Sequence, residues 1–340
     1  MSKNREIESS TVLTGDRPTG PLHLGHYAGS LKTRVALQER GERCFVMIAD
    51  CQAYTDNVDN VAKVTEAIRH LVADYLAVGI APEKTCVFLQ SGVPELAELT
   101  VLYMNMVTVA RLERNPTVRE EIKQRGFVRG IPAGFLCYPV SQAADITGFR
   151  ADVVPVGEDQ LPMIELAQEV ANRINRAVGS DLIPIPKAML SDVGRLPGTD
   201  GKAKASKSLG NAIHFCDDAT TVRNKVMSMF TDPGHLRVSD PGKVEGNAVF
   251  AYLDAFDPDK EEVQALKERY RKGGLGDVTL KKRLAAVLED LIGPIRQKRE
   301  AAYGDAEMCV EVLRSGTIRA REAVAETLSS IKKGLGMCIL

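Results

Sequence analysis

Short apolar runs and longer amphipathic stretches alternate along the first half of the chain. The apolar runs have the length of buried strands and lie at 11–14, 44–50, 85–89 and 153–156. Apolar residues recur near helical spacing over 22–39, 61–77 and 161–174. This alternation predicts an α/β fold with a Rossmann-type, doubly wound parallel sheet, whose right-handed connections put the carboxyl ends of its strands on one edge.

The second half of the chain shows helical spacing without a convincing strand. The predicted helices lie at 219–229, 261–271, 279–291 and 306–328, the last with a break at Gly316. We therefore predict a sheet-containing domain over 8–212, an all-helical domain over 213–330 and a tail over 331–340. A further helix over 93–110 is so apolar that it must be buried, either inside the chain or against a second copy.

Composition excludes several classes of protein. The chain has 340 residues, of which 44% are hydrophobic and 26% charged, as in an ordinary globular protein with more than one domain. Its net charge is −1, so binding to a nucleic acid would need a local basic patch. The seven cysteines form no CxxC pair, and no signal-peptide core or membrane span is visible. We expect a cytoplasmic protein.

The segment after the first predicted strand carries candidate chemistry. Gly15 to Gly20 predicts a loop, and His23-Leu24-Gly25-His26 opens the following helix. Two histidines three residues apart share a helix face and can donate to one anion, which the start of a helix also favours. The same short motif occurs as an ordinary pair of surface histidines, so this segment alone decides nothing.

Three polar residues farther along predict one end of a pocket. Tyr138, Gln142 and Asp145 are spaced four and three apart, so on a helix they face the same way. A phenol, an amide and a carboxylate suit the polar end of a site for an aromatic ligand. The alternative is that Asp145 is simply a solvated helix residue.

A loop rich in glycine and lysine follows at 194–211. Lys202, Lys204 and Lys207 lie among its glycines, and such mobile cations suit a triphosphate chain. The loop lacks the GxxxxGK[ST] pattern of a P-loop. An exposed linker would also be basic, but it would not explain the order Lys-Ala-Ser-Lys-Ser at 204–208.

Taken together, His-Leu-Gly-His at 23–26 and Lys-Ala-Ser-Lys-Ser at 204–208 resemble the HIGH and KMSKS signatures of class I aminoacyl-tRNA synthetases. Within that class, the segments that resemble tryptophanyl-tRNA synthetases are 15–20, 138–139, 143–146, 154–160 and 293–299. The resemblance runs from about residue 10 to 330. It implies a Rossmann-type catalytic domain, a helical anticodon-binding domain and a homodimer. The implied reaction is ATP-dependent activation of L-tryptophan and its transfer to tRNA(Trp), with Mg²⁺ bound to ATP and no metal fixed by the protein.

The same resemblance implies four groups of site residues. The catalytic residues are His23, His26, Lys204 and Lys207. The residues that bind ATP are Arg17, Thr19, Gly20, Gly25, His26, Gly157, Asp159, Lys204, Ser206 and Lys207. The tryptophan pocket comprises Leu13, Gln52, Tyr138, Gln142, Asp145, Val154, Val156 and Gln160. The residues near tRNA, or supporting its binding surface, are Arg296, Lys298 and Arg299.

Three alternatives remain open on the residues themselves. A tyrosyl-tRNA synthetase could use the same polar helix face for a phenol, although the valines of 154–160 favour the broader indole. A small adenylyltransferase shares the HxGH turn but would need neither the lysine loop nor the large helical region. A regulatory nucleotide- or tRNA-binding relative is disfavoured because both signatures keep their charged residues. Ala205, Gln52 and Arg17 depart from the family pattern and suggest a divergent, auxiliary subfamily.

Overall fold

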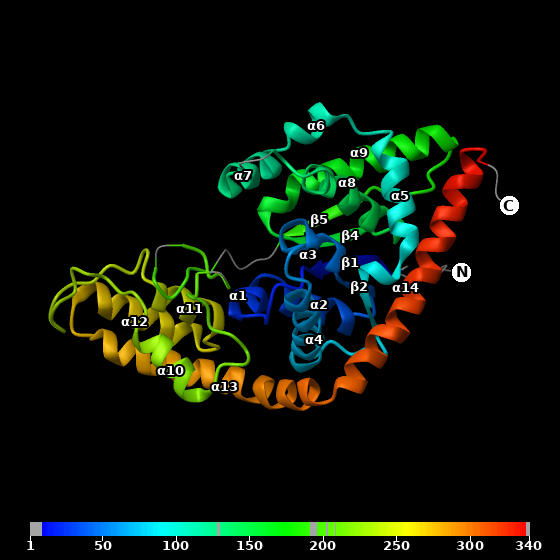
Figure 1. The fold of residues 1–340 in the computed structure, drawn as a ribbon. Helices are drawn as coiled ribbons and strands as arrows, with labels where there is room; N and C mark the ends of the chain where they lie inside the picture. The colour runs from blue at the N-terminus through cyan, green and yellow to red at the C-terminus, as the bar shows by residue number, and fades with distance from the viewer. Residues whose placement is uncertain (1–8, 128–129, 191–195, 202, 208, 338–340) are drawn as a thin grey trace, which may run out of the picture.

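A five-stranded parallel sheet lies at the centre of the molecule (Figure 1). The computed structural model describes residues 9–127, 130–190, 196–201, 203–207 and 209–337. The strands are arranged in the order β3-β2-β1-β4-β5, with bounds β1 Thr11–Asp16, β2 Arg43–Ile48, β3 Thr85–Leu89, β4 Val153–Val156 and β5 Lys187–Leu190. Every neighbouring pair is parallel, which confirms the predicted doubly wound α/β fold. β5 was not predicted, and β1 extends two residues into the predicted loop.

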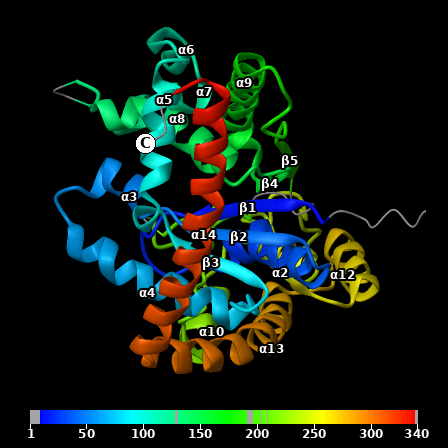
Figure 2. The same ribbon diagram turned by 90° about the vertical axis from the view of Figure 1, so that its right-hand side faces the viewer.

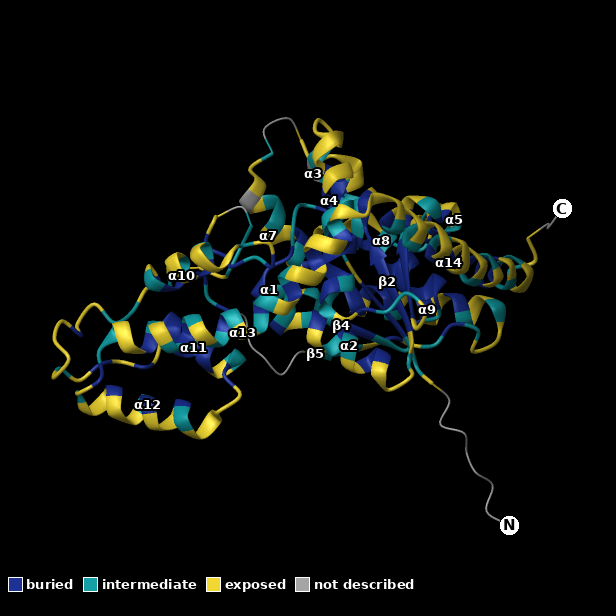
Figure 3. Cartoon of the chain, turned by 90° about the horizontal axis from the view of Figure 1, so that it is seen from below, coloured by how far each residue is buried: buried dark blue, intermediate teal, exposed yellow. Residues whose placement is uncertain are grey.

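Helices cover both faces of this sheet. Val46 and Ile48 of β2 pack on the face that carries α4 (Val61–Val78). Phe45 and Met47 point to the opposite face, which is covered by α5 (Pro94–Met104), α8 (Ala133–Gly148) and α9 (Leu161–Val178). Because successive side chains of a strand point to opposite faces, a strand buried on both sides is apolar throughout. Figure 3 shows the sheet as the buried centre of this part of the chain.

The helix predicted over 22–39 is divided into three parts. α1 (Leu24–His26) is followed by a π-helical turn, Tyr27–Leu31, and then by α2 (Lys32–Glu39). Single π-helical turns inside helices are rare and occur frequently at functional sites. Here the π-helical turn directly follows the segment that carries the two histidines.

The remaining helices differ from the predictions in detail. The bounds are α3 Asp50–Asn57, α6 Val109–Glu113, α7 Pro116–Arg125, α10 Ala219–Met227, α11 Ala248–Phe256, α12 Lys260–Lys272 and α13 Asp277–Gly304. The apolar stretch 93–110 is two helices, α5 and the start of α6, instead of one. α13 continues through Pro294, and α11 was not predicted. None of the helices in the described residues is long and apolar enough to cross a membrane.

The last helix, α14 (Ala306–Gly334), returns from the helical region to the sheet and crosses β3 (Figure 2). It is continuous at Gly316, where we predicted a break. A Cβ at Gly316 would lie 1.8 Å from the carbonyl oxygen of Val87, so glycine is needed for this close crossing. Ile331, predicted as tail, is fully buried. α14 thus packs on the sheet as well as against α13, and the predicted domain boundaries stay a prediction.

Candidate active site

A cavity of about 330 Å³ opens at the carboxyl ends of β1, β2 and β4. This is the edge of an open parallel sheet at which ligands bind. All of the residues predicted for the tryptophan pocket line it: Leu13, Gln52, Tyr138, Gln142, Asp145, Val154, Val156 and Gln160. Arg17 and Gly157 from the predicted ATP group line it as well. The structure thus brings these residues together, while their individual roles stay predictions.

One face of α8 supplies three polar residues of the cavity, Tyr138, Gln142 and Asp145, as the spacing predicts. The Tyr138 hydroxyl donates to Oε2 of Glu121 at 2.9 Å, and Gln142 Nε2 donates to Oε1 of Gln160 at 3.3 Å. Burial and the neighbouring Glu121 carboxylate raise the pKa of Tyr138 well above its usual value. The phenol therefore stays protonated, with its hydrogen committed to Glu121.

Asp145 is the least exposed polar residue of the lining, at 1%. Gln52 Nε2 donates to its Oδ2 at 2.8 Å, and Gln90 Nε2 lies 3.0 Å from both carboxylate oxygens. Burial raises the pKa of Asp145 to about 7, although the two amide hydrogen bonds favour the ionised form. The carboxyl is held in place by two donors and still has oxygen lone pairs for a ligand donor.

Gln90 was missed by the sequence analysis. It directly follows β3, and the carboxyl ends of parallel strands meet at one edge of the sheet, so the signal was present in the sequence. The lining also includes polar residues that were not predicted, such as Asp16, Ser30 and Arg34, and the unpredicted apolar residues Met47, Ala49, Phe135, Ile146 and Pro155. Apolar side chains together with a buried acceptor suit a flat aromatic ligand that carries an N–H or O–H donor.

Backbone N–H groups of the turn fix the tautomer of each of its two histidines. Nδ1 of His23 accepts from the Gly25 N–H at 3.1 Å, and Nδ1 of His26 accepts from the His23 N–H at 3.2 Å. Each proton is thereby assigned to Nε2. Burial lowers the pKa of His23 far below its usual value and that of His26 to about 4. Both rings are neutral N–H donors at neutral pH.

Gly25 is required by the turn itself. A Cβ at this position would lie 2.8 Å from Cε1 of His23, so a side chain would displace the imidazole. The space that a side chain at Gly25 would need is taken by His23, which is 5% exposed, and the predicted role of Gly25 in binding ATP stays a prediction.

The lysine loop lies against the turn. Lys207 Nζ donates to the Gly20 carbonyl oxygen at 2.7 Å and lies 3.5 Å from Oγ1 of Thr19. Burial lowers the pKa of Lys207, and the carboxylates of Asp16 and Asp74 oppose that shift. Just after the loop, the carbonyl oxygen of Ile213 accepts from the Leu24 N–H at 3.0 Å, which links the turn to the chain that follows the lysine loop. The two signature segments therefore lie close together in the structure.

Other members of the ATP group lie around this contact. The Lys204 side chain is exposed, and the Ser206 N–H donates to Oδ1 of Asn211 at 2.8 Å. Asp159 is not among the residues that line the cavity, but its Oδ2 accepts from Gln160 Nε2 at 3.3 Å. Lys202 and Ser208 lie outside the described residues.

An ionic cluster whose charged members, Asp16 and Arg34, line the cavity was not predicted. Oδ2 of Asp16 accepts from Arg34 Nη1 at 2.6 Å and from the Tyr75 hydroxyl at 2.7 Å. Burial opposes ionisation of Asp16, but Arg34 outweighs it and holds the pKa of the carboxyl well below its usual value. Arg34 resembles any solvated helix arginine in sequence, so only the fold reveals the pair.

Two of the three residues predicted near tRNA are engaged inside the protein. Arg296 donates to both carboxylate oxygens of Glu289 at 2.9 and 2.8 Å, and to the Asp217 carbonyl oxygen at 2.7 Å. Arg299 is 4% exposed and pairs with Asp74. These positions favour the supporting role and not direct phosphate contact. Lys298 is exposed.

Comparisons with known proteins agree with this architecture. Residues 5–293 match the family of class I tRNA synthetases for W and Y. The tryptophan–tRNA ligase of Clostridium longisporum is 54% identical over 96% of both chains, and that of Streptococcus pneumoniae TIGR4 is 52% identical over 96% of this chain and 97% of its own. A tryptophanyl-tRNA synthetase from Campylobacter jejuni, solved with ADP and tryptophan, is 30% identical with a TM-score of 0.83, covering 96% of this chain and 100% of that one. The chain belongs to the tryptophanyl-tRNA synthetases, within the class I tRNA synthetases for tryptophan and tyrosine.

Proposed function

We propose that this protein activates L-tryptophan with ATP and transfers it to tRNA(Trp). The observation that carries the proposal is the position of Asp145, a buried acceptor in the lining of a cavity that also reaches the loop before the histidine turn. The two relatives at 54% and 52% identity are tryptophan–tRNA ligases, and the match covers nearly their whole length.

The proposed reaction has two steps. In the first, a carboxylate oxygen of tryptophan attacks the α-phosphorus of ATP, the bond to the β-phosphate oxygen breaks, and tryptophanyl-adenylate and pyrophosphate form. In the second, a hydroxyl at the 3′ end of tRNA attacks the carbonyl carbon and AMP leaves. Such phosphoryl chemistry depends mainly on positioning and on electrostatic stabilisation.

The chain offers groups of the required kind for the first step. The Nε2–H groups of His23 and His26 are assigned as donors, which suits oxygens whose negative charge grows in the transition state. Lys207 and Lys204 supply positive charge for the departing pyrophosphate. Mg²⁺ enters as part of the substrate MgATP and neutralises phosphate charge; these lysines and histidines suit the phosphates and not the metal ion.

The main competing substrate is tyrosine, because Asp145 could also accept from a phenol. In the structure the Tyr138 hydroxyl already donates to Glu121, and Asp16, the third carboxylate in the lining, is paired with Arg34. Asp145, held by its two glutamines, is the least exposed carboxylate of the lining, and we assign the donor of the ligand to it. A small adenylyltransferase would not need a lysine loop tied to the turn.

The proposal is tested by ATP–pyrophosphate exchange with each of the twenty amino acids. We expect tryptophan to be activated far better than tyrosine, and purified tRNA(Trp) to become charged with tryptophan. A preference for tyrosine, or exchange without any aminoacylation of tRNA, would contradict the proposal.

Tryptophan activation should weaken as the pH falls through the pKa of Asp145. That pKa is about 7 because burial disfavours the charged carboxylate. Below it the proton competes with the indole N–H, so the KM for tryptophan should rise from about pH 8 to about pH 6, by up to tenfold per unit. Asp145→Asn cannot titrate and should abolish this dependence. A KM that is flat in the wild type over this range would contradict the assignment.

Other properties of the family are carried over as proposals. We propose a homodimer that uses the exposed apolar residues Val101, Met104 and Val109 of α5 and α6, which are 61%, 43% and 59% exposed. The other side of α5 packs inside the chain. Burial inside the chain and burial against a second copy, the two alternatives for this segment, are therefore compatible. We also propose contact of Lys298 with tRNA, a cytoplasmic location and an auxiliary role suggested by Gln52 and Arg17.

A further inference from the structure

Two adjacent residues of α4 hold both ends of the loop that leads into the histidine turn. Oδ2 of Asp74 accepts from the Leu22 N–H at 2.7 Å, immediately before His23. The Tyr75 hydroxyl donates to Asp16 at 2.7 Å, where the loop begins. Between these anchors, Gly20 accepts from Lys207. The position of α4 therefore determines the position of the loop that leads to the two histidines and that Lys207 contacts.

The Asp74 carboxylate is shared with α13. Its Oδ1 accepts from Nε of Arg299 at 2.5 Å, and Nη2 of Arg299 lies 2.7 Å from Nδ1 of His70 on α4. Asp74 is fully buried and Arg299 is 4% exposed, so each charge has been taken out of water and depends on the other. Burial raises the pKa of Asp74 to about 6, opposed by the charge of Arg299, so the carboxyl is ionised above neutral pH.

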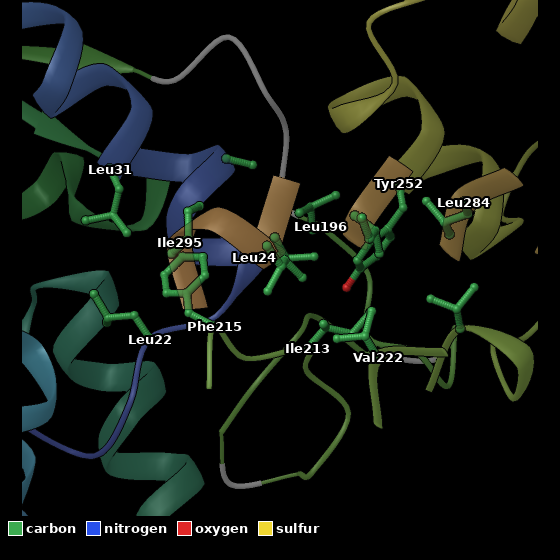
Figure 4. Close-up of a cluster of buried hydrophobic side chains, with 14 of the residues drawn as sticks. Leu22, Leu24, Leu31, Leu196, Ile213, Phe215, Val222, Tyr252, Leu284 and Ile295 are labelled. Carbon is green, nitrogen blue, oxygen red and sulfur yellow. The ribbon is translucent and has the colours of Figure 1, made fainter. Parts of the chain in front are cut away.

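α13 also shares a buried apolar cluster with the turn. Figure 4 shows Leu22 and Leu24 of the turn in one buried cluster with Leu284 and Ile295 of α13. The same helix packs along α10 and α11 of the helical region. A displacement of α13 would therefore move Arg299 and this apolar cluster together.

We propose that Asp74 is a positioning residue for the His23–His26 turn, and that Arg299 couples its position to that of α13. The helical region thereby influences ATP activation without touching ATP. This inference rests on the proposed adenylate-forming activity and adds to it a polar connection between the two parts of the chain. Tryptophan binding should be independent of it, because neither residue lines the cavity.

Two double variants separate positioning from the need to pair a buried charge. Asp74→Asn/Arg299→Gln keeps an oxygen for the Leu22 N–H and leaves no charge, so we expect a kcat for pyrophosphate exchange within about threefold of the wild type. Asp74→Leu/Arg299→Met also leaves no charge but removes the acceptor, and its kcat should fall roughly tenfold or more. Equal kcat values in the two folded double variants would overturn the proposal.

The coupling to α13 is tested by Arg299→Gln with Arg283→Gln as its matched control. Arg283 is also on α13 and pairs with a buried carboxylate, Asp257, at 2.7 Å. Each variant leaves a buried carboxylate unpaired, so we expect both to lower the thermal unfolding temperature. Only Arg299→Gln unpairs the carboxylate that holds Leu22, so only this variant should lower kcat, by roughly threefold or more, with tryptophan affinity unchanged. Equal losses of kcat in both would show a general packing effect and would overturn the coupling. A wild type that activates no amino acid would instead contradict the proposed function.

Discussion

Lys207→Ala is expected to lower the rate of adenylate formation by about 10²-fold or more while tryptophan still binds. Lys207 is on the loop that contacts the histidine turn, and its ammonium lies 2.7 Å from the Gly20 carbonyl oxygen. A cation at this place meets negative charge that grows as pyrophosphate leaves, so most of its effect belongs to the transition state. The measurement is single-turnover adenylate formation.

Tryptophan binding can be followed directly, because the chain contains no tryptophan of its own and the fluorescence of the ligand indole has no protein counterpart. Lys207→Arg keeps the charge and should retain more activity than Lys207→Ala. Lys333→Ala, an exposed lysine in the last turn of α14, is the control for loss of a positive charge. A single-turnover rate of Lys207→Ala within a few-fold of the wild type would exclude this role.

The sheet could be predicted because its central strands are buried on both faces and read as continuous apolar runs. β5 could not be predicted, since Lys187 and Leu190 of this edge strand are exposed. β3, at the other edge, keeps the apolar signal because α14 packs on it. α11 was missed because it is apolar nearly all round and too short to show a period. At Gly316 the sequence suggested a break, but the glycine serves a close crossing of α14 over β3.

The candidate site was predictable where its residues share one element. Tyr138, Gln142 and Asp145 share a helix face, and spacing alone predicts that they point the same way. The partners of Asp145 come from two other segments, and their meeting depends on the order of strands in the sheet, which local patterns do not encode. Burial of Arg299 could not be predicted either. The charged residues around it suggest an exposed segment, and only the packing of α13 on α4 shows that Arg299 is buried.

Asp145→Ala should cut kcat/KM for tryptophan by roughly 10²-fold or more with the KM for ATP nearly constant. Indole N–H is a donor only, so a buried tryptophan needs an acceptor, and the carboxylate of Asp145 is a buried acceptor in the lining of the cavity. The substitution removes this acceptor and also leaves the amides of Gln52 and Gln90 without their shared partner.

Phenylalanine brings no donor and would leave the desolvated carboxylate unpaired, so the wild type should reject it without a second editing site. A site built to hydrogen-bond a phenol rejects phenylalanine for the same reason, and the logic carries over to a site for an indole. Asp145→Asn is the informative partner variant, because its amide oxygen can still accept from indole while its charge is gone. We expect its kcat/KM to lie between those of Asp145→Ala and the wild type. If Asp145→Ala were as active as the wild type, tryptophan would have to bind away from this carboxylate, and the cavity at the ends of β1, β2 and β4 would need another ligand.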